Sequence, residues 1–275
     1  MTDLRYFVVD AFTDRPFAGN PAAVYPLDAW LPDATLLAIA REMALSETAF
    51  LVREGDDLRL RWFTPEHEVD LCGHATLATA CVLMTQLEPA RTAVEFQSRS
   101  GRLGVTREGA RFTLDFPSRP PEPEADPALR DALAAIFGRR PREVWRSRDV
   151  VAVFDHPEDV AKLAPDLAAL RALDVFAVVA TARGALADRP ATPEAPADFV
   201  SRFFAPREGI DEDPVTGSAH CTLVPLWASK LERTALIGHQ ISRRGGVIHT
   251  RLVDDRVLLT GDAVLVATGA LHLPA

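Results

Sequence analysis

Hydrophobic and polar positions along the first half of the chain alternate in short runs, a pattern typical of half-buried β-strands. Glycine-containing turns such as Ser100-Gly101 and Glu108-Gly109 separate some of these runs. Helical spacing appears in two stretches, residues 33–44, where Asp33 is the predicted N-cap, and residues 73–86. The predicted strands cover residues 4–9, 47–53, 58–63, 93–98, 102–107 and 110–116.

The second half repeats this mixture of strands and helices after a proline-rich segment. Residues 117–125 contain the run PSRPPEPE, which can continue neither a helix nor a central strand and is predicted to be an interdomain linker. A second proline-rich loop is predicted at 188–197. The fold class predicted from both halves is α+β, with mostly antiparallel strands. The elements expected here are helices 128–137, 157–171 and 217–231, and strands near 142–147, 149–154, 174–180 and 199–204.

One sequence pattern occurs twice, at a spacing of about half the chain. The run RWFTP at 61–65 precedes an acidic loop and then CGHA at 72–75. The run RFFAP at 202–206 precedes a longer acidic loop and then TGSA at 216–219. A repeat of this size indicates a duplicated domain. We therefore predict an N-terminal domain over residues 1–117 and a C-terminal domain over 125–261.

The repeated glycines, Gly73 and Gly217, are each expected to open a helix. Two similar domains usually meet at a cleft, where ligand sites are common. A glycine lets the backbone approach a ligand, and the first amides of a helix suit a carboxylate. The repeat thus predicts an anion-binding site in the cleft. The alternative is that small residues only let each helix start tightly against a strand.

Acid/base chemistry is suggested by carboxylates and imidazoles in three segments. The loops at 66–74 and 208–218 are rich in titratable groups, the parts needed for proton abstraction and return. Most of these acids, including Glu66, Asp211 and Glu212, are expected to be solvated. Glu47 lies between an apolar helix and an apolar strand, which predicts partial desolvation of its carboxylate. The alternative for Glu47 is a structural hydrogen bond at the end of that helix.

Charge and composition exclude several classes of function. Thirty basic and 39 acidic residues give a net charge of −9, which argues against nucleic acid and anionic membranes as partners. The N-terminus lacks the features of a signal peptide, and no apolar run has membrane-spanning length, so a cytoplasmic location is expected. Three cysteines without a CxxC pair make a disulfide scaffold improbable.

Four motifs, in order along almost the whole chain, resemble those of the PhzF family. They are VDAF at 9–12 with GNPA at 19–22, SETAF at 46–50, CGHAT at 72–76 and DPVTGSAH at 213–220. The family comprises phenazine-biosynthesis-type isomerases of the diaminopimelate-epimerase-like fold. The resemblance implies two pseudo-symmetric domains, each a mostly antiparallel sheet wrapped around a central helix. It also implies a last strand, 262–275, that returns to the first domain, and a homodimer.

The same resemblance implies roles for individual residues. Glu47 would be the acid/base that shuttles the proton, and His74 would contact the substrate and assist proton movement. Asp213 would orient polar groups of the substrate. The implied reaction is a proton shift on a small, possibly cyclic amino or hydroxy acid, without a metal or an organic cofactor. The substrate-binding residues would be Asn20, Gly73, Gly217 and Ser218, the last three holding the substrate carboxylate.

Three other functions compete with this interpretation. Related epimerases use one cysteine at each pseudo-symmetric turn, but this chain has Cys72 at the first turn and Thr216 at the second, whose hydroxyl does not ionise at neutral pH. The acidic loop matches no HExxH or CxxC signature of a zinc hydrolase, and Cys72 is expected to be a small buried hydrophobe. A carboxylate-binding or sensor protein without catalysis remains open, as does the identity of the substrate.

Overall fold

A computed structural model describes residues 2–188 and 196–273 and divides the chain into two compact units. The first unit contains residues 1–116 and 259–275, and the second contains residues 117–258. Most of the predicted proline-rich loop at 188–197 lies outside the described residues. Along the described residues, no helix is long and apolar enough to cross a membrane.

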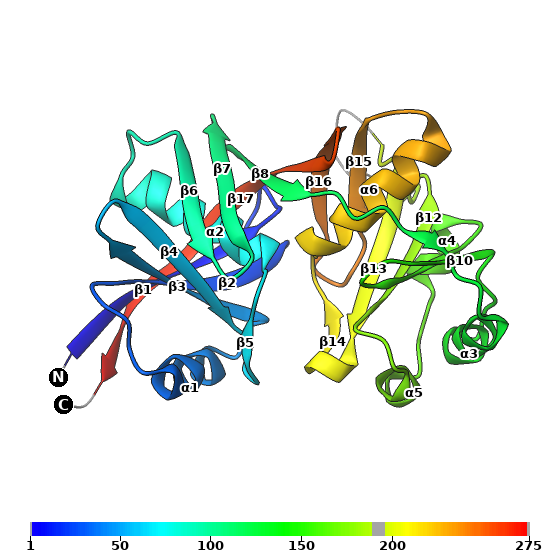
Figure 1. The fold of residues 1–275 in the computed structure, drawn as a ribbon, viewed down its shortest axis with the longest axis horizontal. Coiled ribbons are helices and arrows are strands. Elements are labelled where there is room, and N and C mark those ends of the chain that lie inside the picture. The colour runs from blue at the N-terminus through cyan, green and yellow to red at the C-terminus, as the bar shows by residue number, and fades with distance from the viewer. Residues whose placement is uncertain (1, 189–195, 274–275) are drawn as a thin grey trace. The chain divides into compact units, whose positions relative to one another are not determined.

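The first unit is a mixed sheet with helices (Figure 1). β2 pairs antiparallel with β1 and parallel with β3, and β4 pairs antiparallel with β3 and parallel with β6. β7 continues antiparallel from β6 and pairs with β8. The bounds of these strands are Thr2–Ala11 (β1), Asn20–Leu27 (β2), Glu47–Glu54 (β3), Asp57–Phe63 (β4), Glu68–Val69 (β5), Ala93–Ser98 (β6), Gly101–Glu108 (β7) and Arg111–Pro117 (β8).

Helix α2, Gly73–Val82, is the connection between the parallel strands β4 and β6. Every one of its residues is buried, which fits its sequence GHATLATACV, mostly small and apolar residues without Asp, Glu, Lys or Arg. It packs against β1, β2 and β3, and a π-helical turn, Leu83–Leu87, extends it. The other helix of this unit, α1 (Asp33–Met43), buries only one face, through Leu36, Ile39 and Ala40. The amphipathic helix lies outside, and the apolar one inside.

The second unit repeats the same order of strand pairings. β11 pairs antiparallel with β10 and parallel with β12, and β13 pairs antiparallel with β12 and parallel with β15. β16 is antiparallel to β15. Every step matches its counterpart in the first unit, as expected for a duplicated domain. The bounds are Glu143–Arg146 (β10), Val150–Val153 (β11), Val178–Arg183 (β12), Phe199–Ala205 (β13), Ile210–Asp213 (β14), Ala235–Gln240 (β15) and Gly246–Val253 (β16).

Helix α6, Gly217–Leu231, occupies the position in the second unit that α2 has in the first. It connects parallel strands β13 and β15, and its residues are buried from Gly217 to Ala228. Pro225 inside it lacks an N–H group, so the carbonyl of Cys221 has no intrahelical donor. The backbone N–H of Arg119 donates to that carbonyl at 2.9 Å. The remaining helices are α3 (Pro127–Phe137), α4 (Pro157–Ala161), α5 (Leu167–Ala172) and the short 3-10 turn Pro206–Glu208.

The last strand, β17 (Arg256–Leu273), pairs antiparallel with β1. The pairs run from Thr2 with Leu273 to Ala11 with Ala263, with a register shift between Val8 and Val9. Figure 1 shows the two strands side by side, in blue and red. The N-terminal and C-terminal strands therefore belong to one unit. The predicted linker is not entirely irregular, because β9 (Glu122–Pro123) pairs with β10.

Some element predictions were wrong. β2 was not predicted, because two prolines and two alanines hide its alternation. The predicted helix over 157–171 is two short helices, α4 and α5, interrupted before Asp166, which caps α5. Asp33 is not the N-cap of α1: Pro32 takes that position, and the carboxylate of Asp33 pairs with Arg61. β14 lies where an acidic loop was expected.

Candidate active site

Glu47 and His74 lie side by side in the first unit. Glu47 is the first residue of β3, and His74 follows the first residue of the buried helix α2. His74 Nε2 is 3.3 Å from Glu47 Oε2, and both side chains are largely buried. The described residues give His74 Nε2 no well-aligned hydrogen bond. The separation of 3.3 Å is close to the range of N–H···O hydrogen bonds.

Asn20 fixes the other nitrogen of the His74 ring. It is the first residue of β2, it is fully buried, and its Nδ2 lies 3.0 Å from His74 Nδ1. An amide nitrogen can only donate, so Nδ1 accepts this hydrogen bond and the ring proton sits on Nε2. That proton is on the side facing Glu47. The neutral imidazole therefore presents a donor to the carboxylate.

Burial keeps His74 uncharged. Desolvation lowers the pKa of His74 to about 3, because the charged imidazolium is disfavoured away from water. At neutral pH the ring is thus neutral and holds one proton. It can orient a carboxylate and stabilise its charge, but it is a poor donor of that proton. The carboxylate of Glu47 is the better proton carrier of the two.

The loop between β1 and β2 positions Asn20. Its residues Phe12, Phe17 and Gly19 all have positive φ, at 60°, 67° and 63°. The buried carboxylate of Asp10 accepts a hydrogen bond from the backbone N–H of Phe17 at 2.7 Å. A β-carbon on Gly19 would lie 2.2 Å from the carbonyl oxygen of Ala11. The motifs VDAF and GNPA are therefore parts of one tightly folded loop that ends at the site.

Cys72 is the third polar neighbour of His74. It is the N-cap residue of α2, it is buried, and its Sγ lies 3.5 Å from His74 Nδ1. The side chains of Glu47, Cys72 and His74 offer ligand atoms within 4.8 Å of one another, a set that can in principle hold a divalent cation. A cation there would occupy the carboxylate of Glu47 and prevent it from carrying a proton. All three cysteines of the chain are free thiols.

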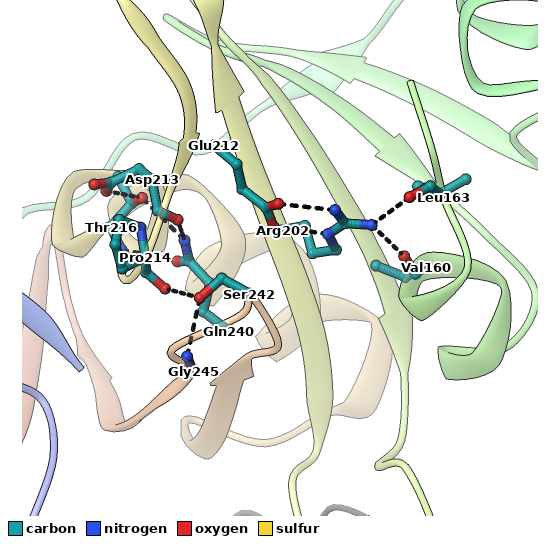
Figure 2. A network of polar contacts seen from close by, with 10 residues as sticks. All are labelled: Val160, Leu163, Arg202, Glu212, Asp213, Pro214, Thr216, Gln240, Ser242 and Gly245. Atoms are coloured by element: carbon teal, nitrogen blue, oxygen red, sulfur yellow. Dashed lines mark hydrogen bonds and ion pairs between the residues drawn. The ribbon is translucent and has the colours of Figure 1, made fainter. Parts of the chain in front are cut away.

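In the second unit, Asp213 is part of a network that shapes the start of α6 (Figure 2). The hydroxyl of Thr216, the N-cap residue of α6, donates to the carboxylate of Asp213. Gln240, at the end of β15, accepts from the Thr216 backbone N–H at 2.8 Å and donates to the Asp213 carbonyl at 2.7 Å. The turn before α6 is thus held by a buried side chain from a neighbouring strand.

Further contacts hold this turn and the strand before it. The hydroxyl of Ser242 donates to the carbonyl of Pro214 at 2.7 Å and accepts from Gly245. Arg202 of β13 makes a two-fold contact with Glu212, at 2.7 and 2.8 Å (Figure 2). Glu212 was expected to be solvated, and that expectation was wrong, because this ion pair ties β14 to β13. Glu66 and Asp211 are exposed, as expected.

Ser218 follows Gly217, at which α6 begins. Its hydroxyl oxygen accepts a hydrogen bond from Arg148 Nη2 at 3.2 Å. Arg148 in turn pairs with the buried carboxylate of Asp149, at 3.0 Å from Nε. The neighbourhood of the expected carboxylate-binding serine therefore contains a guanidinium group.

The two helix starts share a further detail. Four residues after each N-cap, a side chain bonds to the N-cap carbonyl: Thr76 to that of Cys72, and His220 to that of Thr216, the latter at 2.8 Å. Burial lowers the pKa of His220 to about 4, so this ring too is neutral. Its Nδ1 must then carry the proton that it donates to the carbonyl.

The structure brings some predicted site residues together and adds others. Asn20 and Glu47 both contact His74, and Gly73 opens its helix. Asp213, Gly217 and Ser218 share the turn and first residues of α6. Sequence reasoning missed Gln240, Arg148 and Asp149. None of the three lies in a motif: Arg148 and Asp149 are neighbours in the connection between β10 and β11, and Gln240 ends β15, so no spacing along the chain indicates them.

Comparisons with known proteins agree on one family. The family model for phenazine biosynthesis-like proteins matches residues 9–269. An uncharacterized isomerase of Pseudomonas aeruginosa is 49% identical over 271 residues, covering 98% of this chain and 100% of the relative. The crystal structure of a PhzF-family phenazine biosynthesis protein from Enterococcus faecalis has a TM-score of 0.89 at 44% identity, covering 99% of this chain and 100% of that one.

A more distant structure shares the fold. The structure of a predicted epimerase from Pseudomonas aeruginosa has a TM-score of 0.76 at 23% identity, over 98% of this chain and 100% of that one. The α+β fold with mixed strand pairing is thus common to PhzF proteins and to an epimerase-like structure. Since the family model and the relatives span nearly the whole chain, the protein belongs to the PhzF family of phenazine biosynthesis-like proteins.

Proposed function

We propose that this protein is an isomerase that moves a proton within a small carboxylate-bearing substrate, with Glu47 as the proton carrier. The observation that carries the proposal is the 3.3 Å contact between Glu47 Oε2 and a buried, neutral His74. A carboxylate that is shielded from water and faces one N–H donor is suited to take a proton from carbon and return it elsewhere. The names of the relatives as isomerases support the same reaction class.

The proposed reaction has two proton transfers. Glu47 starts as a carboxylate, oriented by the Nε2–H of His74, and removes a proton from one carbon of the substrate. The electrons shift through the unsaturated system of the substrate. Glu47, now protonated, delivers the proton to a second carbon and becomes a carboxylate again. The proton that Glu47 removes is the one that it returns, and the electrons stay within the substrate. The proposal therefore includes no metal and no organic cofactor.

The remaining residues are proposed to bind the substrate. Gly73, Gly217 and Ser218 would hold its carboxylate, because helix N-terminal amides and a hydroxyl are suitable donors. Asp213 would orient a polar group such as an amino or hydroxyl substituent. The proposed substrate class is therefore a small, possibly cyclic amino or hydroxy acid, and the proposed assembly is a homodimer.

Deuterium incorporation tests the proposal. The protein is incubated in heavy water with a panel of cyclic amino and hydroxy acids, and NMR follows deuterium entering carbon-bound positions. Replacing Glu47→Gln removes the acid/base group while keeping its size, so we expect exchange to slow by about 10²- to 10⁴-fold with nearly unchanged ligand affinity. The matched control is Glu54→Gln, at the exposed end of the same strand β3, which should exchange normally.

Two outcomes would contradict the proposal. Normal exchange by the Glu47→Gln variant would show that another group carries the proton. Tight binding of a carboxylate from the panel without any exchange would favour a binding or sensor protein instead.

A further inference from the structure

The guanidinium group of Arg148 has an unusual set of contacts in the second unit. Arg148 lies in the connection between β10 and β11, next to Asp149, whose carboxylate is almost completely buried. Its Nε and Nη2 point to Asp149, at 3.0 and 3.4 Å, and Nη2 also donates to the hydroxyl of Ser218. The ring of Phe176 stacks on the guanidinium at 4.4 Å. Four contacts thus fix the orientation of this cation.

A second arginine of the same unit shows what a purely structural arginine looks like here. Arg202 uses Nε and Nη2 for Glu212, and its Nη1 donates to the carbonyls of Leu163 and Val160 (Figure 2). In Arg148, the hydrogen bonds to described residues use only Nε and Nη2. Its Nη1 keeps two donors, and 28% of the side chain is exposed against 14% for Arg202. Arg148 is therefore held in one orientation, as Arg202 is, but the described residues leave the N–H donors of its Nη1 unused.

Ser218 has a donor to spare as well. Its hydroxyl oxygen receives the proton of Arg148 Nη2, and the described residues use this hydroxyl only as an acceptor. The hydroxyl proton is therefore available next to the Nη1 donors of Arg148. An N–H of Nη1 and this hydroxyl can each donate to one oxygen atom of a carboxylate, and hydrogen bonds between a guanidinium and a carboxylate are strong because both groups are charged.

We propose that Arg148 and Ser218 together form the subsite for the substrate carboxylate, with Arg148 as a direct ligand of that group. The proposal rests on the proposed function, in which Ser218 binds the carboxylate, and adds a charged residue that belongs to none of the sequence motifs. Asp149 and Phe176 hold the guanidinium flat and in place, so that little conformational entropy is lost on binding. The substrate class thereby narrows to acids whose carboxylate is free and ionised.

Binding of benzoate tests this subsite without requiring catalysis. Benzoate has a planar carboxylate on a six-membered ring, and benzamide is its neutral counterpart of the same shape. Dissociation constants of both are measured by protein-observed NMR titration at neutral pH for the wild type and for Arg148→Met. A hydrogen bond to a charged group corresponds to at least about tenfold in affinity, so we expect that loss for benzoate and no loss for benzamide.

Further variants separate direct contact from an effect through Ser218. If Arg148 binds the carboxylate itself, the double variant with Ser218→Ala binds benzoate more weakly than either single variant. If the effect of Arg148→Met disappears in the Ser218→Ala background, Arg148 only positions the serine and the proposal fails. The matched control is Arg233→Met, which removes an arginine paired with Asp198 elsewhere in the unit and should leave affinity unchanged. Arg148→Gln replaces Arg148→Met if the latter does not fold, because its amide can still donate to Asp149 but brings no charge for the benzoate carboxylate, and the same loss of affinity is expected.

The result is independent of the proton-shift chemistry. Unchanged benzoate affinity in the Arg148 variants, or no benzoate binding by the wild type, would overturn the subsite. An equal loss for benzamide would overturn it too, because it would show general damage rather than lost recognition of charge. If benzoate binds through Arg148 but Glu47→Gln exchanges normally, the subsite stands and the proposed reaction falls.

Discussion

At the scale of single residues, the protonation state of His74 decides what Glu47 can do. Asn20 donates to His74 Nδ1, which places the ring proton on Nε2, next to the carboxylate. Asn20→Asp replaces this donor with an acceptor of the same shape. In this variant we expect the ring proton to move to Nδ1, so that Nε2 turns a lone pair toward Glu47. Deuterium exchange into the substrate should then slow at least as much as in the comparison variant Asn20→Ala, which only removes the donor. Nitrogen-15 NMR of the His74 ring reports the tautomer, and an unchanged Nε2–H signal in Asn20→Asp would contradict the assignment.

His220 gives a residue-scale prediction about stability and pH. Burial lowers its pKa to about 4, below that of a histidine in the unfolded chain. Between about pH 6.5 and that lowered value, the unfolded chain binds a proton that the folded protein does not. Stability is therefore complete above this window and is lost as the pH falls through it, by up to about 1.4 kcal/mol per pH unit.

The variant that isolates this effect is His220→Asn, whose amide can still donate to the carbonyl of Thr216. Urea unfolding at several pH values should show a shallower fall in the free energy of unfolding for His220→Asn than for the wild type. His74 adds to the loss of stability at low pH, because its pKa is also lowered. It is present in the wild type and in His220→Asn, so its contribution does not affect the comparison. Equal slopes would mean that His220 is charged in the folded protein or is not protonated on unfolding.

At the scale of elements, the loop between β1 and β2 determines where Asn20 lies. Gly19 has a φ of 63°, and a β-carbon there would lie 2.2 Å from the Ala11 carbonyl oxygen. Gly55, in the turn between β3 and β4, has nearly the same φ, 62°, but open space around it. Gly55→Ala should therefore cost only about 1 kcal/mol for the left-handed backbone. Gly19→Ala should lower the stability clearly more, as measured by thermal unfolding, and should slow deuterium exchange into the substrate. Equal losses of stability in the two variants would contradict the role of the close contact between residue 19 and the Ala11 carbonyl.

The elements also show what the sequence could and could not predict. α6 was predicted with its observed bounds, because its apolar run starts at a glycine turn and has helical length. β2 was missed, although it lies between β1 and β3, because Pro21 and Pro26 are typical of loops. Glu47 was indicated by its position between two apolar elements, and Gly73 and Gly217 by the internal repeat. The family resemblance then implied roles for the motif residues. Arg148 and Gln240 were not predicted, because only the folded sheet brings them to α6.

At the scale of the whole molecule, the duplication persists in the strand pairings while the chemistry differs between units. Cys72 and Thr216 are both N-cap residues, and His74 and Ser218 both follow the first residue of their helices. The first unit has an imidazole beside a carboxylate, and the second has a hydroxyl beside a guanidinium. We infer that duplication supplied two similar scaffolds, of which one has the groups proposed for proton transfer and the other has most of the groups proposed to hold the substrate carboxylate.

The C-terminal strand gives the prediction for the whole molecule, because β17 belongs mainly to the first unit. Its residues 263–273 pair with β1 over ten positions, and Leu271 and Leu273 pack on the core that contains Tyr25 and Phe50. A chain that ends at residue 261 loses these contacts. The free energy of unfolding of a typical protein, about 5–15 kcal/mol, is too small to tolerate an unpaired β1 and an opened core.

In the truncated chain, we expect the first unit to exchange its amide hydrogens rapidly, as measured by mass spectrometry. The second unit keeps its two hydrophobic clusters, so residues 117–258 should stay protected. Equal loss of protection in both units would show that they fold only together, and full protection of β1 would show that β17 is dispensable.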